Sequence, residues 1–154
     1  MALDDLARWA LSKGLPGPRI LAHHLACLRD FERVWNYRSR ARAGGAANVR
    51  PAEGSCVWGL VLEVDRETRK LIDRKEGHPG LYSRGDVPIS VELSQEGRSV
   101  QAWVYQVTEA YICDEIIPPT RAYLDLIIGS AIRYNFPAEA VEALQATACR
   151  EQAG

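Results

Sequence analysis

The sequence predicts an α+β fold in which several strands surround one short helix and further helices stand at both ends of the chain. Three patterns indicate this: an apolar stripe at helical spacing near the start, β-branched and aromatic runs in the middle, and a second helical periodicity near the end. At 154 residues the chain has the usual size of one domain. We therefore expect a single domain over residues 1–154 with one small twisted sheet or barrel.

The first predicted helix covers residues 3–13, because its apolar side chains recur on one helical face: Leu3, Leu6, Ala7, Ala10 and Leu11. The Gly-Leu-Pro-Gly-Pro run at residues 14–18 predicts a loop. Residues 20–28 are compatible with a strand or a helix, and residues 31–37 favour a strand. Residues 38–45 are polar, basic and end in glycine, so they predict a second loop.

The middle of the sequence predicts a sheet. Residues 56–64 form a β-branched and aromatic run that is typical of a buried strand. Residues 87–93 and 100–107 also have strand patterns, and the Glu96-Gly97 pair between them favours a hairpin. The paired prolines at positions 118 and 119 then end the sheet region.

The last third of the chain predicts a helical tail. Residues 120–135 form an amphipathic helix with one apolar face: Tyr123, Leu124, Ile127, Ile128 and Ala131. Pro137 opens a final helix near its first turn, in which Val141 and Leu144 are the apolar positions.

Composition disfavours several classes of partner. The formal net charge is -1, so nothing favours nucleic acid or an anionic membrane. The start lacks the basic and apolar regions of a signal peptide, and no apolar run is long enough to cross a membrane. The cysteines at positions 27, 56, 113 and 149 lack zinc-ligand spacing and are expected to be reduced thiols. We therefore expect a cytoplasmic protein.

Motifs for several kinds of catalysis are incomplete. His23 and His24 have no further ligands at zinc spacing, which favours ordinary histidines over a metal site. Arg38, Arg40 and Arg42 form a basic cluster without a nucleic-acid motif, which favours a solvated loop over an anion contact. No phosphate-binding, GxSxG or Cys-His motif occurs in the sequence. We therefore expect no metal, no cofactor and no covalent nucleophile.

Glu76 is the strongest candidate for chemistry. A short helix is predicted between an Asp65 cap and Gly77, with Leu71 and Ile72 facing inward. Glu76 follows Ile72 by four residues and therefore shares its inward face. The negative end of a helix dipole disfavours the charged carboxylate, and partial burial acts in the same direction. A carboxyl group in that position is suited to general acid/base catalysis.

Four segments resemble the γ-glutamylcyclotransferase-like family. Residues 71–82 are similar to its Leu-Asp-x-x-Glu-Gly…Tyr segment. Residues 44–59 carry its Gly-Gly-x-Ala and Val-Trp-Gly patterns, residues 103–107 fit its late strand, and residues 118–124 fit the start of its C-terminal helix. The resemblance extends over residues 19–144.

This resemblance implies a small mixed β-barrel with flanking helices and a helical C-terminal tail. It also implies an enzyme that cyclises a γ-glutamyl amide to 5-oxoproline and releases a free amine, without metal or cofactor. Glu76 would be the general acid/base, and Tyr82 would border the site or pack as an ordinary strand residue. Four further residues are expected to bind substrate: Asn36, Arg38, Gly44 and Gly45. We expect an arginine of the 38–45 loop to contact the leaving amine, whose identity the sequence leaves open.

The start of the chain departs from the family pattern. Members carry a strand that ends in Tyr-Gly-Ser-Asn or a close variant and whose N–H groups hold the substrate, whereas this sequence begins at the helix that follows. Two interpretations stay open: a cyclotransferase completed by upstream residues, and an inactive relative that acts as a binding module. The missing strand would leave an open sheet edge beside residues 56–64, which favours homo-oligomers.

Overall fold

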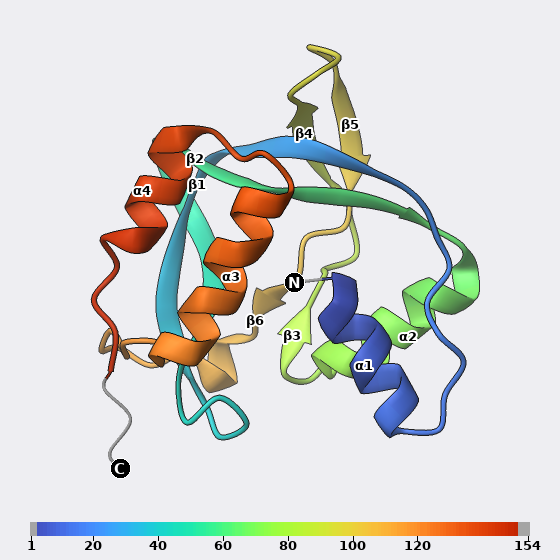
Figure 1. The fold of residues 1–154 in the computed structure, drawn as a ribbon, viewed down its shortest axis with the longest axis horizontal. Coiled ribbons are helices and arrows are strands. Elements are labelled where there is room, and N and C mark those ends of the chain that lie inside the picture. Colours follow the sequence, from blue (N-terminus) through green and yellow to red (C-terminus); the bar gives the residue numbers. More distant parts are fainter. Residues whose placement is uncertain (1–2, 151–154) are drawn as a thin grey trace.

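The computed structural model describes residues 3–150, and within them four α-helices surround one long β-hairpin and two smaller strand pairs (Figure 1). This confirms the α+β class. In chain order the elements are α1 (Leu3–Ser12), β1 (Ile20–Ser39), β2 (Gly44–Val64), α2 (Arg66–Glu76), β3 (Tyr82–Ser83), β4 (Ile89–Leu93), β5 (Ser99–Ala102), β6 (Gln106–Val107), the short 3₁₀ helix η1 (Glu109–Tyr111), α3 (Arg121–Arg133) and α4 (Ala138–Gln145).

The β1–β2 hairpin is longer than the sequence predicts. Residues 20–28 are a strand, and β2 already begins at Gly44. The loop predicted over residues 38–45 is therefore wrong in its extent, because Ser39 pairs with Gly44 and the turn is confined to residues 40–43. Continuous antiparallel pairing holds even polar residues of both strands in an extended conformation, which overrides their weak strand propensity.

Irregular pairing bends this hairpin over the molecule. Its register shifts between Arg29 and Phe31, where Asp30 has φ 58° and Gly54 has φ 77°. The Gly54 N–H donates to the Asp30 carboxylate at 2.9 Å, so this backbone group at the bulge has a hydrogen-bond partner within the hairpin. In Figure 1 both strands curve from α3 and α4 across to α2.

The expected barrel is not closed. Within residues 3–150 the four-stranded sheet has the order β2-β1-β4-β5, and β3 and β6 form a separate pair. The predicted 87–93 and 100–107 hairpin exists as β4 and β5, but the second strand ends at Ala102, and residues 106–107 pair with β3 instead. β2 therefore lies at a sheet edge, and β6 is joined to it through side chains, since Gln106 donates to the Val49 carbonyl at 3.2 Å.

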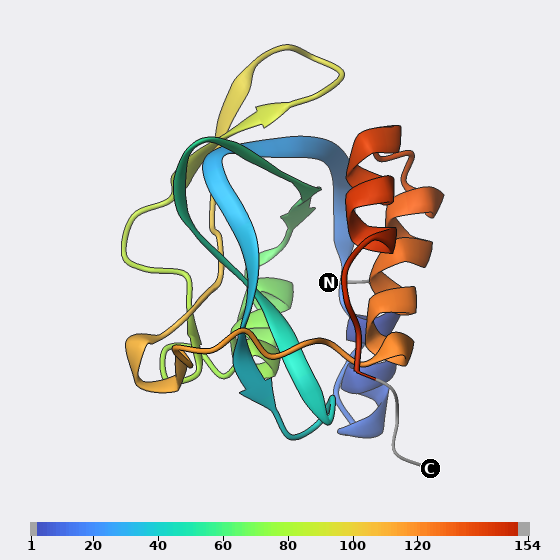
Figure 2. The same ribbon diagram turned by 90° about the vertical axis from the view of Figure 1, so that its left-hand side faces the viewer.

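An apolar core lies between the hairpin and the two C-terminal helices. It is formed by Trp35 of β1, Leu124 and Ala131 of α3, and Leu144 of α4. Figure 2 shows α3 and α4 side by side on one side of the hairpin. The apolar face predicted for residues 120–135 is confirmed: Tyr123, Ile127 and Ile128 also pack against this core.

The helix α1 packs beside α2 at the other end of the molecule (Figure 1). Leu6 and Ala10 of its predicted apolar stripe are fully buried. The predicted caps of α2 are also confirmed: Asp65 accepts the Thr68 N–H at 2.7 Å, and Gly77 ends the helix in the left-handed region with φ 68°.

Two of the four cysteines depart from the sequence expectation. Cys27 of β1 and Cys56 of β2 are joined by a disulfide, with Cα atoms 6.2 Å apart. Cys56 pairs with Arg29 in the hairpin and is therefore diagonal to Cys27. Their spacing in sequence does not reveal this, because it depends on the strand register. Cys113 and Cys149 are free thiols.

None of the helices in the described part of the chain is long and apolar enough to cross a membrane.

Candidate active site

Glu76 is the last residue of α2, as the sequence predicts. A pair of backbone bonds fixes this end of the helix: His78 N–H donates to the Asp73 carbonyl at 2.9 Å, and Gly77 N–H donates to the Arg74 carbonyl at 3.3 Å. Ile72, one turn earlier, is buried, and Glu76 is half-buried. Within residues 3–150, no hydrogen bond or ion pair engages the Glu76 carboxylate.

Three tyrosines from different elements lie within electrostatic range of this carboxylate. They are Tyr82 of β3, Tyr105 before β6 and Tyr123 of α3. Burial raises the pKa of each phenol, and the negative charge of Glu76 raises each of them further. The three hydroxyl groups therefore stay protonated, and those of Tyr82 and Tyr105 donate to the Ala47 carbonyl and to the Asp73 carboxylate.

Tyr82 is held by its hydroxyl group and by its ring. The hydroxyl donates to the Ala47 carbonyl at 2.9 Å, and the ring meets Tyr37 edge-to-face with centroids 5.8 Å apart. Its backbone pairs with Val107 of β6. Tyr82 is therefore packed, and its place at the border of the site stays a prediction.

Asn36 helps to place this wall of the site. It is buried and accepts a hydrogen bond from the Asn48 side-chain amide at 3.1 Å, and Asn48 in turn accepts the Val107 N–H at 2.9 Å. The pairing of β1 with β2 is irregular at this point, between Val34 and Tyr37. Asn36 therefore connects the hairpin to the β3–β6 pair. Its direct contact with substrate stays a prediction.

A mixed-charge cluster lies next to Glu76. The Asp5 carboxylate of α1 is 3.0 Å from Lys75 Nζ of α2 and 3.2 Å from an Arg42 guanidinium nitrogen. Burial raises the pKa of Asp5, but the hydrogen bonds and charges of Lys75 and Arg42 outweigh this and leave that pKa below its usual range. The Arg42 guanidinium also covers the Tyr123 ring at 4.7 Å.

A second hydrogen-bond network fixes the C-terminal turn of α2. Asp73 accepts hydrogen bonds from the Tyr105 hydroxyl at 2.6 Å and from Arg84 at 3.0 Å. Burial raises the pKa of Asp73, yet these two donors and the Arg84 charge hold the pKa below its usual range. Arg84 also stacks on the Trp103 ring at 4.5 Å. This network orients the helix turn that carries Glu76.

Gly44 and Gly45 have a packing role. The Gly45 N–H donates to the Pro118 carbonyl at 3.0 Å, and a Cβ on Gly45 would lie 1.8 Å from the Ile117 carbonyl oxygen. A Cβ on Gly44 would lie 3.1 Å from the Pro118 carbonyl oxygen. The glycine pair therefore allows the 117–120 segment to approach β2 closely. Contact of these glycines with substrate stays a prediction.

The arginines of the hairpin turn divide into two groups. Arg38 and Arg40 are exposed, whereas Arg42 is half-buried and points to Asp5 and Tyr123. The roles of Glu76 and Tyr82 stay predictions. Four residues that had no predicted site role take part in the networks described here: Asp5, Lys75, Tyr105 and Tyr123. Only Tyr123 carried a signal, because it was placed on the inner face of its helix.

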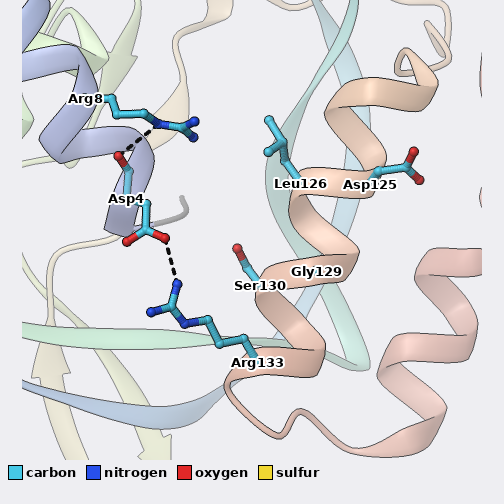
Figure 3. A pocket seen from close by; sticks show the side chains of 7 residues that line it. All are labelled: Asp4, Arg8, Asp125, Leu126, Gly129, Ser130 and Arg133. Carbon is cyan, nitrogen blue, oxygen red and sulfur yellow. Dashed lines mark hydrogen bonds and ion pairs between the residues drawn. The ribbon is translucent and has the colours of Figure 1, made fainter.

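Two hollows in the described part of the chain lie away from Glu76. One, of about 210 Å³, separates α1 from α3, where Asp4 pairs with Arg133 at 2.7 Å (Figure 3). The other, of about 250 Å³, is lined by residues of β1, β4 and β5 near Asp30. Over residues 3–150, no group of three or more His, Cys, Asp or Glu side chains is arranged to hold a metal ion.

Sequence comparisons find relatives over most of the chain. The model of the family described as "Gamma-glutamyl cyclotransferase, AIG2-like" matches residues 7–124. A Bos taurus protein named gamma-glutamylcyclotransferase is 30% identical over 131 residues, which are 81% of this chain and 65% of that protein. A Rattus norvegicus protein named gamma-glutamylaminecyclotransferase is 33% identical over 90 residues, 55% of this chain and 59% of that protein. The chain thus spans less than two thirds of these relatives.

Solved structures share the fold. One described as gamma-glutamyl cyclotransferase has a TM-score of 0.76 at 23% sequence identity, covering 99% of this chain and 88% of that one. A Homo sapiens structure described as an uncharacterized protein has a TM-score of 0.77 at 24% identity with the same coverage. At these identities the likeness is evidence for the fold alone.

Proposed function

Because this chain belongs to the gamma-glutamyl cyclotransferase, AIG2-like family, we propose that it converts a γ-glutamyl amide into 5-oxoproline and a free amine. One observation carries the proposal. Glu76 is half-buried at a fixed helix end, and within residues 3–150 its carboxylate has no hydrogen-bond or ion-pair partner. Such a carboxylate is available for proton transfer.

The proposed reaction needs one proton carrier. Glu76 takes a proton from the substrate's α-ammonium group, and the freed amine attacks the γ-carbonyl carbon. The negative charge then develops on the carbonyl oxygen, and hydrogen-bond donors at that position stabilise it. The bond to the leaving amine breaks as the protonated Glu76 returns a proton to it. The ring nitrogen, which still carries two hydrogens, then gives one to the Glu76 carboxylate, and Glu76 releases that proton to the free amine or to water. Most of the rate advantage comes from holding the amine against its own γ-carbonyl.

The exposed part of the hairpin turn is the proposed contact for the leaving amine. Arg38 is exposed next to the buried Ser39 at the end of β1, and the exposed Arg40 begins the turn. We assign these two arginines to the leaving group, with Asn36, Gly44 and Gly45 as the wall behind them. Replacing Arg38 by Gln is expected to change KM among different γ-glutamyl amides while leaving stability nearly unchanged, as for other surface positions.

A binding module without turnover is the second candidate. The observation that favours it is that the Tyr82 and Tyr105 hydroxyl groups already donate to the Ala47 carbonyl and the Asp73 carboxylate, so neither is free to stabilise a developing oxyanion. A module of this kind would bind γ-glutamyl amides and leave them intact. The assay for turnover therefore decides between the two functions.

We further propose a cytoplasmic single domain that forms homo-oligomers through β2. β2 is a sheet edge, and Val57, Trp58 and Leu60 on it are only half-buried. Exposed strand edges of this kind pair readily with a second chain. Light scattering after size exclusion should show a dimer or larger assembly, and a charged residue in place of Leu60 should shift it toward the monomer.

The decisive assay compares γ-glutamyl amides with a control amide that lacks the attacking amine. The protein is incubated with γ-glutamyl amides that differ in the leaving amine, and 5-oxoproline and glutamate are both quantified. We expect 5-oxoproline without glutamate. An N-acetylated γ-glutamyl amide is the matched control: it lacks the attacking amine, so a cyclotransferase leaves it intact and a hydrolase cleaves it. Glutamate release, or cleavage of the acetylated control, would contradict the proposal. Binding without any product would favour the module.

A further inference from the structure

The Asp5 carboxylate pairs with two cations, Lys75 and Arg42, that come from different elements. It lies in the first turn of α1, whereas Lys75 belongs to the last turn of α2 and Arg42 to the hairpin turn. The Lys75 side chain is 13% exposed and that of Arg42 is 32% exposed. Among the described residues, the Asp5 carboxylate is the shared acidic partner of both cations. Arg42 and Lys75 thus form a half-buried binding position for one carboxylate, called the cradle below.

This cradle adjoins the catalytic carboxylate. Lys75 directly precedes Glu76 in α2, and Arg42 covers the ring of Tyr123. The Tyr123 phenol is buried, and the charges of Arg42, Glu76 and Asp5 all act on its pKa. Arg42 of the cradle and Glu76 therefore lie within electrostatic range of the same tyrosine.

The chemistry of a γ-glutamyl amide requires such an arrangement. Its α-carboxylate is bonded to the same carbon as the α-amine, so an amine that reaches Glu76 places a carboxylate only a few atoms away. The product, 5-oxoproline, keeps that carboxylate. A paired lysine and arginine are the side chains that bind carboxylates most strongly.

We propose that Arg42 and Lys75 form the subsite for the α-carboxylate of the substrate, and that Asp5 occupies this subsite as an intramolecular competitor. The proposal rests on the proposed function. Substrate must displace the Asp5 side chain from the two cations before the amine reaches Glu76.

Displacement of Asp5 does not require α1 to leave. Leu6 and Ala10 are fully buried and hold the helix through its apolar face. The neighbouring Asp4 forms a separate, exposed ion pair with Arg133. An Asp5 side chain can therefore turn away by rotation about its own bonds while the helix stays packed.

Asp5→Asn tests the competitor directly, with Asp4→Asn as the matched control on the same helix. We expect Asp5→Asn to lower KM for γ-glutamyl amides by roughly 3- to 10-fold at unchanged kcat, because the competing charge is removed. Asp4→Asn should leave both constants unchanged. A purely structural role of Asp5 would instead lower the melting temperature without lowering KM, and that result would overturn the proposal.

Binding of the product tests the subsite without turnover. Calorimetry with 5-oxoproline should show tighter binding to Asp5→Asn and weaker binding to Arg42→Gln and Lys75→Gln, each confirmed as folded by circular dichroism. The matched ligand is 2-pyrrolidinone, which has the same ring without the carboxylate and should bind all variants alike. If Arg42→Gln and Lys75→Gln bind 5-oxoproline as well as the wild type, the subsite is wrong. If 5-oxoproline binds as expected but no γ-glutamyl amide is turned over, the proposed function fails and the subsite stands.

Discussion

The two sides of the β1–β2 hairpin differ in what they bury. Toward α3 and α4 the hairpin contributes Trp35 to an apolar core, in which Leu124 and Leu144 are almost fully buried. Toward α1 and α2 it contributes Arg42 and the Ala47 carbonyl to a cluster of charges and hydroxyl groups. Tyr123 belongs to both, since its ring lies 6.1 Å from Trp35 and under the Arg42 guanidinium.

We infer from this difference that one side of the hairpin mainly stabilises the fold and the other side mainly serves the proposed reaction. The apolar side gains free energy from removing side chains from water, and any well-packed residue of similar shape serves. The polar side holds charged groups at a cost, which is compensated in part by ion pairs and hydrogen bonds. We therefore expect substitutions on the apolar side to change the free energy of unfolding, and substitutions on the polar side to change turnover.

The largest effect on stability is expected for Leu124→Ala. Leu124 is 0% exposed, so its truncation leaves a cavity and should lower the free energy of unfolding by about 2–5 kcal/mol. Ile132→Ala in the same helix is the control, because Ile132 is 57% exposed and its truncation should cost about 0.5 kcal/mol or less. Urea denaturation measures both. Equal losses would contradict the position of the core.

Gly45→Ala is expected to have the next largest effect. The added Cβ would lie 1.8 Å from the Ile117 carbonyl oxygen, so the 117–120 segment must move away from β2. We expect a loss of ~1–3 kcal/mol or more. Gly59→Ala in the same strand is the matched control, since no heavy atom lies within 4 Å of its Cβ position. A well-tolerated Gly45→Ala would show that the close approach is not required.

Thr120→Ala should have a smaller effect, because it removes one cap. The Thr120 hydroxyl accepts the Tyr123 N–H at 3.3 Å at the start of α3. Its loss is expected to cost ~1 kcal/mol, whereas Thr120→Ser keeps the hydroxyl and should cost less. Thermal unfolding of both variants provides the comparison, and equal losses would assign the effect to the methyl group instead.

The smallest effect is a pH dependence from Asp5. Its folded pKa is lower than the ordinary 3.8, so its contribution is present above that value and is lost as pH falls through the folded pKa. The partly exposed pair should contribute about 1 kcal/mol or less. Stability curves of the wild type and Asp5→Asn should therefore differ at neutral pH and converge below pH 3.8. Curves that diverge on acidification would have the opposite sign.

Sequence patterns predicted the apolar side better than the polar side. The apolar faces of α1 and α3 follow from helical periodicity, and the ends of α2 follow from Asp65 and Gly77, because these signals act over a few residues. The extent of β1 and β2 did not follow, since long-range pairing extends both strands through polar residues. The disulfide between Cys27 and Cys56 depends on the same register.

The position of Glu76 was predictable from one helix, but its surroundings were not. Asp5, Arg42 and Tyr123 lie far apart in the sequence and meet only because the hairpin turn reaches α1 and α3. No local pattern encodes such a meeting. The closed barrel was expected from family resemblance, and the described residues form an open sheet because β3 and β6 pair apart from the larger sheet.

The most direct test of the central claim is the rate of 5-oxoproline release by Glu76→Gln. Glu67→Gln is the matched control: it makes the same chemical change in the same helix, at a side chain that is 76% exposed. We expect Glu76→Gln to lose ~10²-fold or more in kcat, with stability unchanged or slightly higher because a charge is removed from the negative end of the helix. Glu67→Gln should keep full activity. A Glu76→Gln protein that is folded and releases 5-oxoproline at the wild-type rate would contradict the assignment of Glu76 as the proton carrier.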